Sequence, residues 1–562
     1  MPFLATILIP FLYKKWGDRI HTGWFVVFVP LTIFISLLLY LPEISNGDTI
    51  ATSMPWIPSL GINLDLYLDG LALLFALIIS GIGTLVVIYS IFYMAKEREA
   101  LHNFYIYLLL FMGAMLGLVT TDNVLALYTV WELTSISSFL LIAYWYERKK
   151  SRAGNLKEML ITVFGGLMLL AGLIMLSMIT DTYSIREMIT SVGAIKDSYL
   201  FIPAMLLILL GAFTKSAQFP FSIWLPDAME APTPISAYLH SATMVKAGIY
   251  LVARMTPIFG GSGTWFWLVT GIGVLTLLYG SLRAVRQTDL KALLAFSTIS
   301  QLGLIVSLLG VGSVAFYYGD SDQQALYALA LFAALFHLFN HSTFKGALFM
   351  VVGIIDHESG TRDIRRLGGL ISIMPITFTV AIIGSLSMAG LPPFNGFLSK
   401  EMFLTGMLQA AEVNIFTLDG LTILFPIIAW VASVFTFIYC FILLFKPFFG
   451  SLKLEQLPKK TVREAPIGML IPPIVLAILV VVIFFLPNVL ADYILKPALL
   501  SIGPVATLEE IPYEITAWHG WNTELYMTIG IVVVGFLLFY LVKNWNSILR
   551  IYPDNLTLNS LY

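Results

Sequence analysis

The feature that most constrains this chain is the recurrence of apolar stretches of about 20 residues along its whole length. Of its 562 residues, 59% are hydrophobic and 11% are charged, whereas a soluble domain has about 25% charged residues. Within lipid a chain must satisfy its backbone polar groups internally, so repeated stretches of this kind indicate a bundle of spanning helices. We therefore predict an all-α polytopic membrane protein and exclude a single anchor or signal peptide.

About fifteen stretches are long and apolar enough to be transmembrane helices. We place them at 2–13, 24–42, 70–94, 104–121, 123–146, 159–180, 200–225, 232–258, 265–282, 291–311, 325–354, 371–407, 422–445, 467–487 and 525–542.

The basic residues divide unevenly between the two sets of alternating loops, 23 of the 31 falling in one set. That set is Lys14, Lys15, Arg19, Lys96, Arg98, Arg148, Lys149, Lys150, Arg152, Lys157, Arg283, Arg286, Lys291, Arg362, Arg365, Arg366, Lys446, Lys453, Lys459, Lys460, Arg463, Lys543 and Arg550. The other set is Arg186, Lys196, Arg254 and Lys496. Because Lys and Arg concentrate on the cytoplasmic side of membranes, we predict an outside N-terminus and a cytoplasmic C-terminus.

The cysteine content and the glycine pattern exclude several classes of chemistry. The one cysteine, Cys440, excludes a disulfide framework, a thiolate zinc site and an iron–sulfur cluster held by this chain alone. The sequence has no phosphate-binding glycine loop. We therefore predict no cofactor, no metal site and no nucleic-acid partner, and we expect a transporter rather than an enzyme.

The remaining four lysines, at positions 215, 246, 345 and 400, lie inside predicted spans together with Glu132. A charge at mid-membrane costs about 2.5–3.5 kcal/mol on insertion scales, so these groups must face the bundle interior. Structural pairing of Lys with Glu is one interpretation. Four cations against one clear anion do not neutralise pairwise, which favours a titrating relay in which some lysines are neutral part of the time.

Three histidines lie near these lysines in the sequence. His337, His341 and Lys345 follow one another at intervals of four residues and share one helix face. A metal site is the alternative, but Leu338 stands where a zinc protease motif has glutamate, and imidazole suits proton transfer. His240 and Lys246 are about 120° apart on a continuous helix and could flank one cavity; alternatively, His240 only bonds a neighbouring helix.

Two helix breaks accompany two of the lysines. Lys215 precedes Pro220, and Lys400 follows "LPPFNGF" inside a run too long for one span. Paired broken helices are typical of transporters built from two repeats, in which unwound backbone lines a hydrated cavity. Proline kinks that serve only packing are the alternative.

Five segments carry a resemblance to a known superfamily: "VWELTSISSFLLIAYWYE", "GAFTKSAQFPFSIWLPDAMEAPTPISAYLHSATMVKAGIYLVAR", "LKALLAFSTISQLG", "HLFNHSTFKGALFMVVG" and "MAGLPPFNGFLSKEMF". They resemble the antiporter-like subunits shared by respiratory complex I, membrane-bound hydrogenases and Mrp-type cation/proton antiporters. Within that superfamily, "LHNFYIYLLLFMGAMLG", "VVGIIDHESGTRDIRRLGGL" and "EAPIGMLIPP" are most similar to the A subunit of the Mrp-type Na+/H+ antiporters.

The resemblance implies an organisation and a set of roles. It implies two inverted five-helix repeats, at 104–258 and 259–446, between N-terminal helices (1–103) and C-terminal helices (447–562). It implies a Glu132–Lys215 pair and Lys400 as the lysine of the second half-channel. Lys246 and the face formed by His337, His341 and Lys345 would connect them.

The expected function is that of the proton-translocating subunit of a multi-subunit Na+/H+ antiporter in the cell membrane. Its expected partners are other subunits, protons, Na+ and the bilayer. The alternative is a proton-pumping subunit of a complex I-like quinone oxidoreductase or hydrogenase, whose largest such subunit ends in a long amphipathic helix. Here Pro487 is followed by an acidic loop and an ordinary span. A scaffold without transport would leave the buried charges unexplained.

The resemblance is incomplete at both ends of the chain. The first span has about a dozen apolar residues, equivalent to about 18–20 Å of helix, and the A subunit usually continues beyond "LTLNSLY". We expect either an A subunit shortened at both ends or a remainder that lies elsewhere. No sodium site can be assigned from the sequence.

Overall fold

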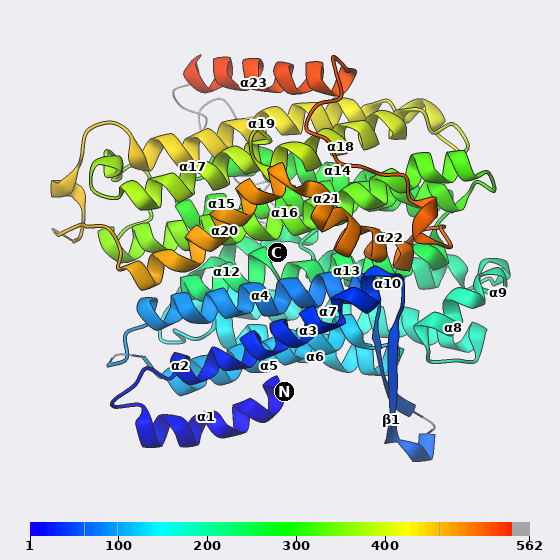
Figure 1. Cartoon of the computed structure of the whole chain (residues 1–562), viewed down its shortest axis with the longest axis horizontal. Helices are drawn as coiled ribbons and strands as arrows, with labels where there is room; N and C mark the ends of the chain where they lie inside the picture. Colours follow the sequence, from blue (N-terminus) through cyan, green and yellow to red (C-terminus); the bar gives the residue numbers. More distant parts are fainter. Residues whose placement is uncertain (61, 98, 460, 542–562) are drawn as a thin grey trace.

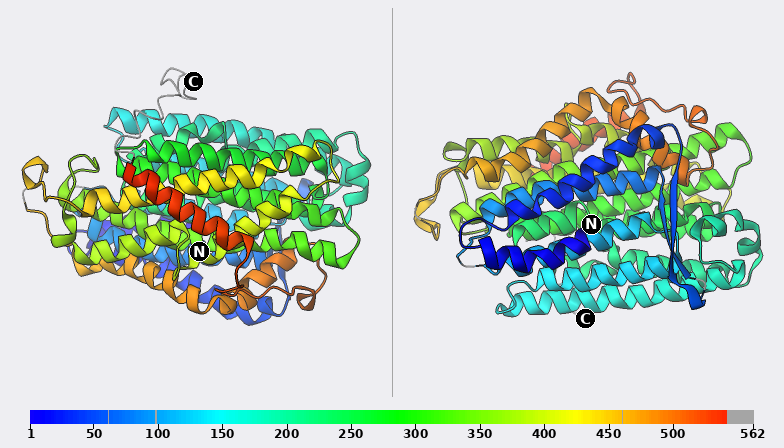
Figure 2. Two further views of the ribbon diagram at one scale, coloured as in Figure 1. Left: turned by 90° about the horizontal axis from the view of Figure 1, so that it is seen from above. Right: turned by 60° about the horizontal axis from the view of Figure 1, so that its bottom comes forward.

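The computed structural model describes residues 1–60, 62–97, 99–459 and 461–541. Its long helices lie side by side along the longest axis of the molecule (Figure 1), and the two further views show the same bundle from other sides (Figure 2). Four of the basic residues used for the predicted orientation, Arg98, Lys460, Lys543 and Arg550, and the last residue of the predicted 525–542 span lie outside the described residues.

Within the described residues, eleven segments are long and apolar enough to cross a membrane. They are α2–α3 (Gly23–Val26 and Phe28–Ser45), α4 (Gly70–Tyr93), α5 (Leu101–Thr120), α6 (Val124–Ile142), α7 (Lys149–Thr180), α14 (Gly263–Val285), α15 (Leu290–Gly312), α16 (Ser321–Ser359), α19 (Leu424–Phe448), α20 (Ile467–Phe485) and α23 (Thr523–Leu541). Each coincides with one of the predicted spans. The chain is therefore a mostly helical, polytopic membrane protein.

The other four predicted spans are shorter or interrupted helices. They are α1 (Pro2–Trp16), α10 with α11 (Phe201–Lys215 and Trp224–Asp227), α12 with α13 (Thr233–Ser241 and Met244–Phe259), and α17 with α18 (Pro375–Ala389 and Asn395–Ala411). Helices are thus interrupted at the two predicted places. They are also interrupted at a third place, between Ser241 and Met244, where the sequence predicted one continuous span.

Three of the eleven long helices are buried most deeply in the bundle. In an apolar stretch of 18 residues within each helix, 94% of the residues of α15 are buried, and those of α4 and α16 are also largely buried. In α23 only 11% are buried. Figure 1 accordingly shows α23 along one edge of the bundle, beside α19. At 39 residues, α16 is about 58 Å long and exceeds the hydrocarbon core of about 30 Å.

A β-hairpin and several short helices lie at one end of the bundle. The strands β1 (Ile50–Ile57) and β2 (Ile62–Leu68) pair antiparallel and run across the helix ends, on the side of α8 (Ile185–Thr190) and α9 (Val192–Asp197) (Figure 1). Further along the chain are α21 (Pro487–Leu490) and α22 (Lys496–Ile502). The hairpin was not predicted from the sequence.

An ion pair is buried beside this hairpin. Asp69 caps the start of α4, accepting a hydrogen bond from the Ala72 N–H, and its Oδ2 lies 2.5 Å from Arg254 Nη1. Burial acts to raise the pKa of Asp69, but the Arg254 charge and the hydrogen bonds together hold it below its ordinary value. The carboxylate is therefore ionised at neutral pH and fixes α4 against α13.

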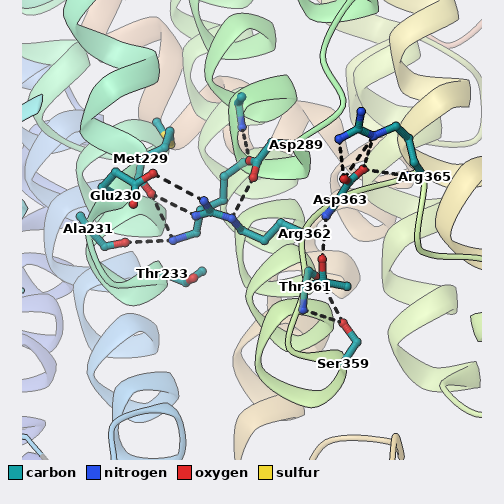
Figure 3. Close-up of polar contacts among 12 residues, drawn as sticks. Met229, Glu230, Ala231, Thr233, Asp289, Ser359, Thr361, Arg362, Asp363 and Arg365 are labelled. Carbon is teal, nitrogen blue, oxygen red and sulfur yellow. Dashed lines mark hydrogen bonds and ion pairs between the residues drawn. The ribbon is translucent and has the colours of Figure 1, made fainter. Parts of the chain in front are cut away.

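A polar network joins loops at the opposite end (Figure 3). Arg362, after α16, contacts Asp289 at 2.9 Å and Glu230 at 3.7 Å. Burial opposes the charge of Arg362, but the Asp289, Asp356 and Glu230 carboxylates raise its pKa. Lys291, which the sequence assigned to a loop, lies in the first turn of α15, is 1% exposed and donates to the Ala231 carbonyl at 2.9 Å. This network connects the α11–α12 region to α15 and α16.

Candidate functional site

The predicted site residues come from six helices and lie in the interior of the bundle. Lys215, His240, Lys246, His337, His341 and Lys345 are fully buried, Lys400 is 8% exposed, and Glu132 is half-buried.

Lys215 is the last residue of α10. Its Nζ donates to Ser135 Oγ at 2.5 Å and to the Trp131 carbonyl at 3.3 Å, and it lies 5.3 Å from the centre of the Trp131 ring. The helix break that follows Lys215 brings the ammonium against α6. The charge is thus solvated by a hydroxyl, a carbonyl and an aromatic face.

Glu132 lies on α6 beside Lys215 but is not in contact with it. Its carboxylate packs against Gly166 of α7, where a Cβ would meet Glu132 Oε1 at 1.7 Å. Among the described residues, no partner hydrogen-bonds this buried oxygen, and no ion pair joins Glu132 to Lys215 within the 4.0 Å limit for such pairs. The carboxylate still acts electrostatically on Lys215. The role of the two residues as a pair remains a prediction.

A second carboxylate, which was not predicted from the sequence, acts on the same lysine. Glu158 on α7 is fully buried, and its charge acts on Lys215 more strongly than that of Glu132 does. Ser138 donates to Glu158 Oε1 at 2.9 Å. The apolar run that defined the predicted span begins at residue 159, whereas α7 begins at Lys149, so Glu158 lies inside the helix. The predicted balance of four cations against one anion is therefore wrong.

The helix break between Ser241 and Met244 separates His240 from Lys246. The predicted angle of 120° on a continuous helix therefore does not apply. Lys246 lies in the first turn of α13 and donates to the Leu338 carbonyl at 2.9 Å and to Ser342 Oγ, both on α16. His240 packs near the rings of Trp224 and Phe349, and neither of its ring nitrogens has a hydrogen-bond partner among the described residues.

The face predicted on α16 is present, and it is bonded to α15 and α18. His337 bonds Gln301 of α15 through Nε2 at 2.8 Å and Ser399 of α18 through Nδ1 at 2.9 Å. The charges of Lys246 and Lys345 act on His341. Because Lys246 bonds this same helix, one row of polar side chains runs from α13 to α18.

The row continues to Lys345 and Lys400. Lys345 Nζ donates to Ser297 Oγ at 2.5 Å and lies 3.2 Å from Met388 Sδ. Lys400 lies in the second turn of α18 against Gly390, where an added Cβ would meet Lys400 Cδ at 2.6 Å. Gly390 has a φ of 80°, in the left-handed region that favours glycine. The helix break between α17 and α18 and the position of the Lys400 side chain therefore depend on this glycine.

The arrangement is a chain of buried titratable groups separated by hydroxyls, amides and sulfur. Such groups can exchange protons with one another when the intervening polar atoms or water reorient. A buried polar row joined across interrupted helices is typical of membrane proteins that move protons.

Comparison with protein families identifies this class. Residues 121–426 match the model of the NADH:quinone oxidoreductase/Mrp antiporter transmembrane family, and residues 55–105 match the N-terminal family of complex I chain 5. The chain is 61% identical over 546 residues to the A subunit of the Na+/H+ antiporter of Alkalihalophilus pseudofirmus, covering 97% of this chain and 68% of that protein. It is 58% identical to the corresponding A subunit of Bacillus subtilis, covering 100% and 70%. The chain belongs to the A-subunit family of Na+/H+ antiporters.

Solved structures show the same fold. The Mrp complex of Dietzia sp. DQ12-45-1b contains a chain that matches with a TM-score of 0.86 and 32% identity, covering 100% of this chain and 57% of that one. This chain thus spans little more than half of its structural relative. An archaeal membrane-bound sulfane sulfur reductase shares the fold, with a TM-score of 0.74 at 24% identity over 91% of this chain and 97% of that one.

Proposed function

We propose that this chain is the large proton-translocating subunit of a multi-subunit Mrp-type Na+/H+ antiporter in the cell membrane. The observation that carries the proposal is the row of buried polar side chains from Lys246 to Lys400, with Lys215 also buried at a helix break, in a chain of this family. The relatives are named as subunits of Na+/H+ antiporters. By this inference the protein works with companion subunits, with Na+ and H+ as its substrates.

The proposed topology follows the sequence prediction. It has about fifteen spans, an outside N-terminus and a cytoplasmic C-terminus. The inverted five-helix repeats would be residues 104–258 and 259–446, flanked by 1–103 and 447–562. This topology puts the β-hairpin outside and the Arg362 network at the cytoplasmic end.

In the proposed relay, Glu132 and Lys215 form the first half-channel. Lys246, with His240 near the break beside it, passes protons to the α16 face. His337, His341 and Lys345 carry them across the second half, and Lys400 completes the path. The hydrogen bond from Lys246 to α16 supports this order, because it connects the first half directly to the helix that bears the histidines.

Na+-dependent dissipation of a proton gradient tests the proposal. The assembled complex is studied in inverted membrane vesicles, with its assembly checked on native gels. Wild type is expected to exchange Na+ for H+, and Lys215→Ala and Glu132→Ala are expected to assemble but to lose exchange. Normal exchange by either assembled variant would contradict the relay.

Reconstitution of the chain without companion subunits gives a second test. We expect little exchange from the isolated chain. Robust Na+/H+ exchange by this polypeptide alone would overturn the proposed dependence on partners.

A further inference from the structure

Glu158 is the buried charge that the proposed relay leaves without a role. It lies nine residues after Lys149, the start of α7, or about 14 Å along the helix axis. That end of α7 is basic and carries the Lys157–Asp227 ion pair one residue before Glu158. Glu158 thus lies between the end of the bundle with the Arg362 network, proposed to be cytoplasmic, and Lys215.

Hydrogen bonds from Glu158 and from Lys215 reach the same segment of α6, at Ser138 and Ser135. Ser138 Oγ is 2.9 Å from Glu158 Oε1 and 2.9 Å from the Ser135 carbonyl, one helical turn away on α6. Ser135 Oγ then accepts from Lys215 Nζ at 2.5 Å. Thr162, on the next turn of α7, lies 3.4 Å from Glu158 Oε1. Both titratable groups therefore reach the same two-serine segment of α6.

Each of the two carboxylates in this site has one oxygen that nothing satisfies. Glu158 Oε2 and Glu132 Oε1 are buried and have no hydrogen-bond partner among the described residues. A buried ionised carboxylate needs donors or a counter-charge on its oxygens. An unsatisfied oxygen on each carboxylate is a place where a proton can reside.

The net charge of Glu132, Glu158 and Lys215 also indicates that one carboxylate can hold a proton. The charged groups acting on Glu158 are Lys215 from α10 and Glu132 from α6. With both carboxylates ionised and Lys215 protonated, the buried cluster has a net charge of −1. It becomes neutral when it holds two protons, one on Lys215 and one on a carboxylate. A Glu132–Lys215 pair alone would be neutral with one.

We propose that Glu158 is a proton-carrying residue that loads Lys215 from the α7 N-terminal side, along the segment of α6 that carries Ser138 and Ser135. In this step the Glu158 carboxylic acid loses one proton and becomes a carboxylate, and the neutral Lys215 amine gains one and becomes an ammonium. The total charge of the pair does not change. The inference rests on the proposed function, because it needs Lys215 to release protons into the relay.

The test uses the assembled complex in inverted vesicles, with Na+-driven exchange measured over a range of pH. Glu158→Gln is expected to lower exchange by at least about tenfold, in line with the loss of a positioned acid or base, and to remove one ionisation from the pH–rate profile. Glu158→Asp, which keeps the acid, is expected to restore much of the rate. A purely structural role would not change the profile in this way.

A matched serine pair tests the path without altering any charge. Ser138→Ala removes the hydroxyl that contacts Glu158, whereas Ser137→Ala removes one that bonds only carbonyls of its own helix, at Leu133 and Thr134. We expect Ser138→Ala to lower exchange several-fold more than Ser137→Ala. Because both variants keep Glu158, they decide the question even if Glu158→Gln does not assemble.

The possible outcomes separate the two proposals. Wild-type rates and an unchanged pH profile in Glu158→Gln, or equal rates in the two serine variants, would overturn the role of Glu158 while Lys215→Ala stayed inactive. Exchange by Lys215→Ala would overturn the relay itself.

Discussion

Two of the buried lysines, Lys215 and Lys345, have opposite chemical surroundings. Lys215 lies among hydroxyls with two carboxylates, Glu132 and Glu158, acting on it. Lys345 contacts a hydroxyl and a thioether, and the charge that acts on it is that of Lys400. No carboxylate of the described residues is among these neighbours.

This difference shows that a buried ammonium can be accommodated in two ways. Near Lys215, anions can balance the charge, so proton occupancy depends on how the three groups share protons. Lys345 and Lys400 repel each other without a counter-charge, so a proton on one disfavours a proton on the other. In the proposed relay, the region around Lys215 would hold protons and the region around Lys345 and Lys400 would pass them on.

Arginine substitution gives the largest expected effect and tests this contrast directly. Arginine keeps the charge but does not deprotonate in proteins. We expect Lys215→Arg to assemble, because the carboxylates balance it, yet to lose transport as fully as alanine does. Native gels and Na+-driven proton exchange measure the two properties separately.

The corresponding substitution at Lys345 should impair assembly of the complex and not transport alone. Lys345→Arg places a permanent charge among neutral groups, and an uncompensated buried charge costs several kcal/mol. We therefore expect reduced assembly rather than an inactive complex. Equal assembly of Lys215→Arg and Lys345→Arg would show that the carboxylates do not distinguish the two regions.

A smaller effect is expected from Gly166→Ala, which acts only on the carboxylate region. The new Cβ would meet Glu132 Oε1 at 1.7 Å, so the Glu132 side chain must move. We expect exchange to fall several-fold because the distance between Glu132 and Lys215 changes. Gly271→Ala is the matched control, since a Cβ there, also in a membrane helix, meets nothing within 4 Å. Similar rates in the two variants would show that the position of Glu132 is unimportant.

Gln301→Leu acts only on the histidine region and should affect stability more than rate. Gln301 Oε1 accepts from His337 Nε2, and its Nε2 donates to Tyr439 at 3.1 Å. Leaving a buried donor without a partner costs about 1–3 kcal/mol. We expect a lower thermal unfolding temperature of the complex with partial exchange remaining. An unchanged unfolding temperature would show that this network does not hold His337.

The smallest effect on transport is expected from protonation of Asp69, which lies outside both regions. Its pKa in the folded protein is below the ordinary value of 3.8. The stability that it contributes is therefore present above pH 3.8 and is lost as pH falls through the lower, folded pKa. A tenfold lower proton affinity in the folded state corresponds to about 1.4 kcal/mol. Unfolding temperatures of wild type and Asp69→Asn should converge only below pH 3.8. Convergence near pH 6 would show that Arg254 does not hold the carboxylate ionised.

The sequence predicted most of the bundle because span length and the cost of a buried charge are local properties. Eleven spans, the interruptions near Lys215 and Lys400, and the helix face of His337 could all be predicted in this way. Glu158 could not, because the apolar stretch begins one residue later and the polar first turns of α7 resemble a loop. A search for carboxylates just before apolar stretches would have identified it.

The third helix break and the contacts of the lysines depend on tertiary structure. No proline or glycine marks the break at Ala242 and Thr243. The partners of Lys215 and Lys246 lie 80 or more residues away in the chain, at Ser135 and Leu338. Helix periodicity carries no information about contacts of that kind.

The breaks also place helix ends of opposite polarity beside two of the buried lysines. Lys215 ends α10, where the exposed carbonyls make the helix terminus negative, and Lys246 lies in the first turn of α13, where the N–H groups make it positive. A positive charge is favoured at the first position and opposed at the second, each by about 0.3–1 kcal/mol. The helix dipoles thus favour a proton on Lys215 over one on Lys246, and because this difference follows from the direction of the polypeptide, no exchange of side chains reverses it.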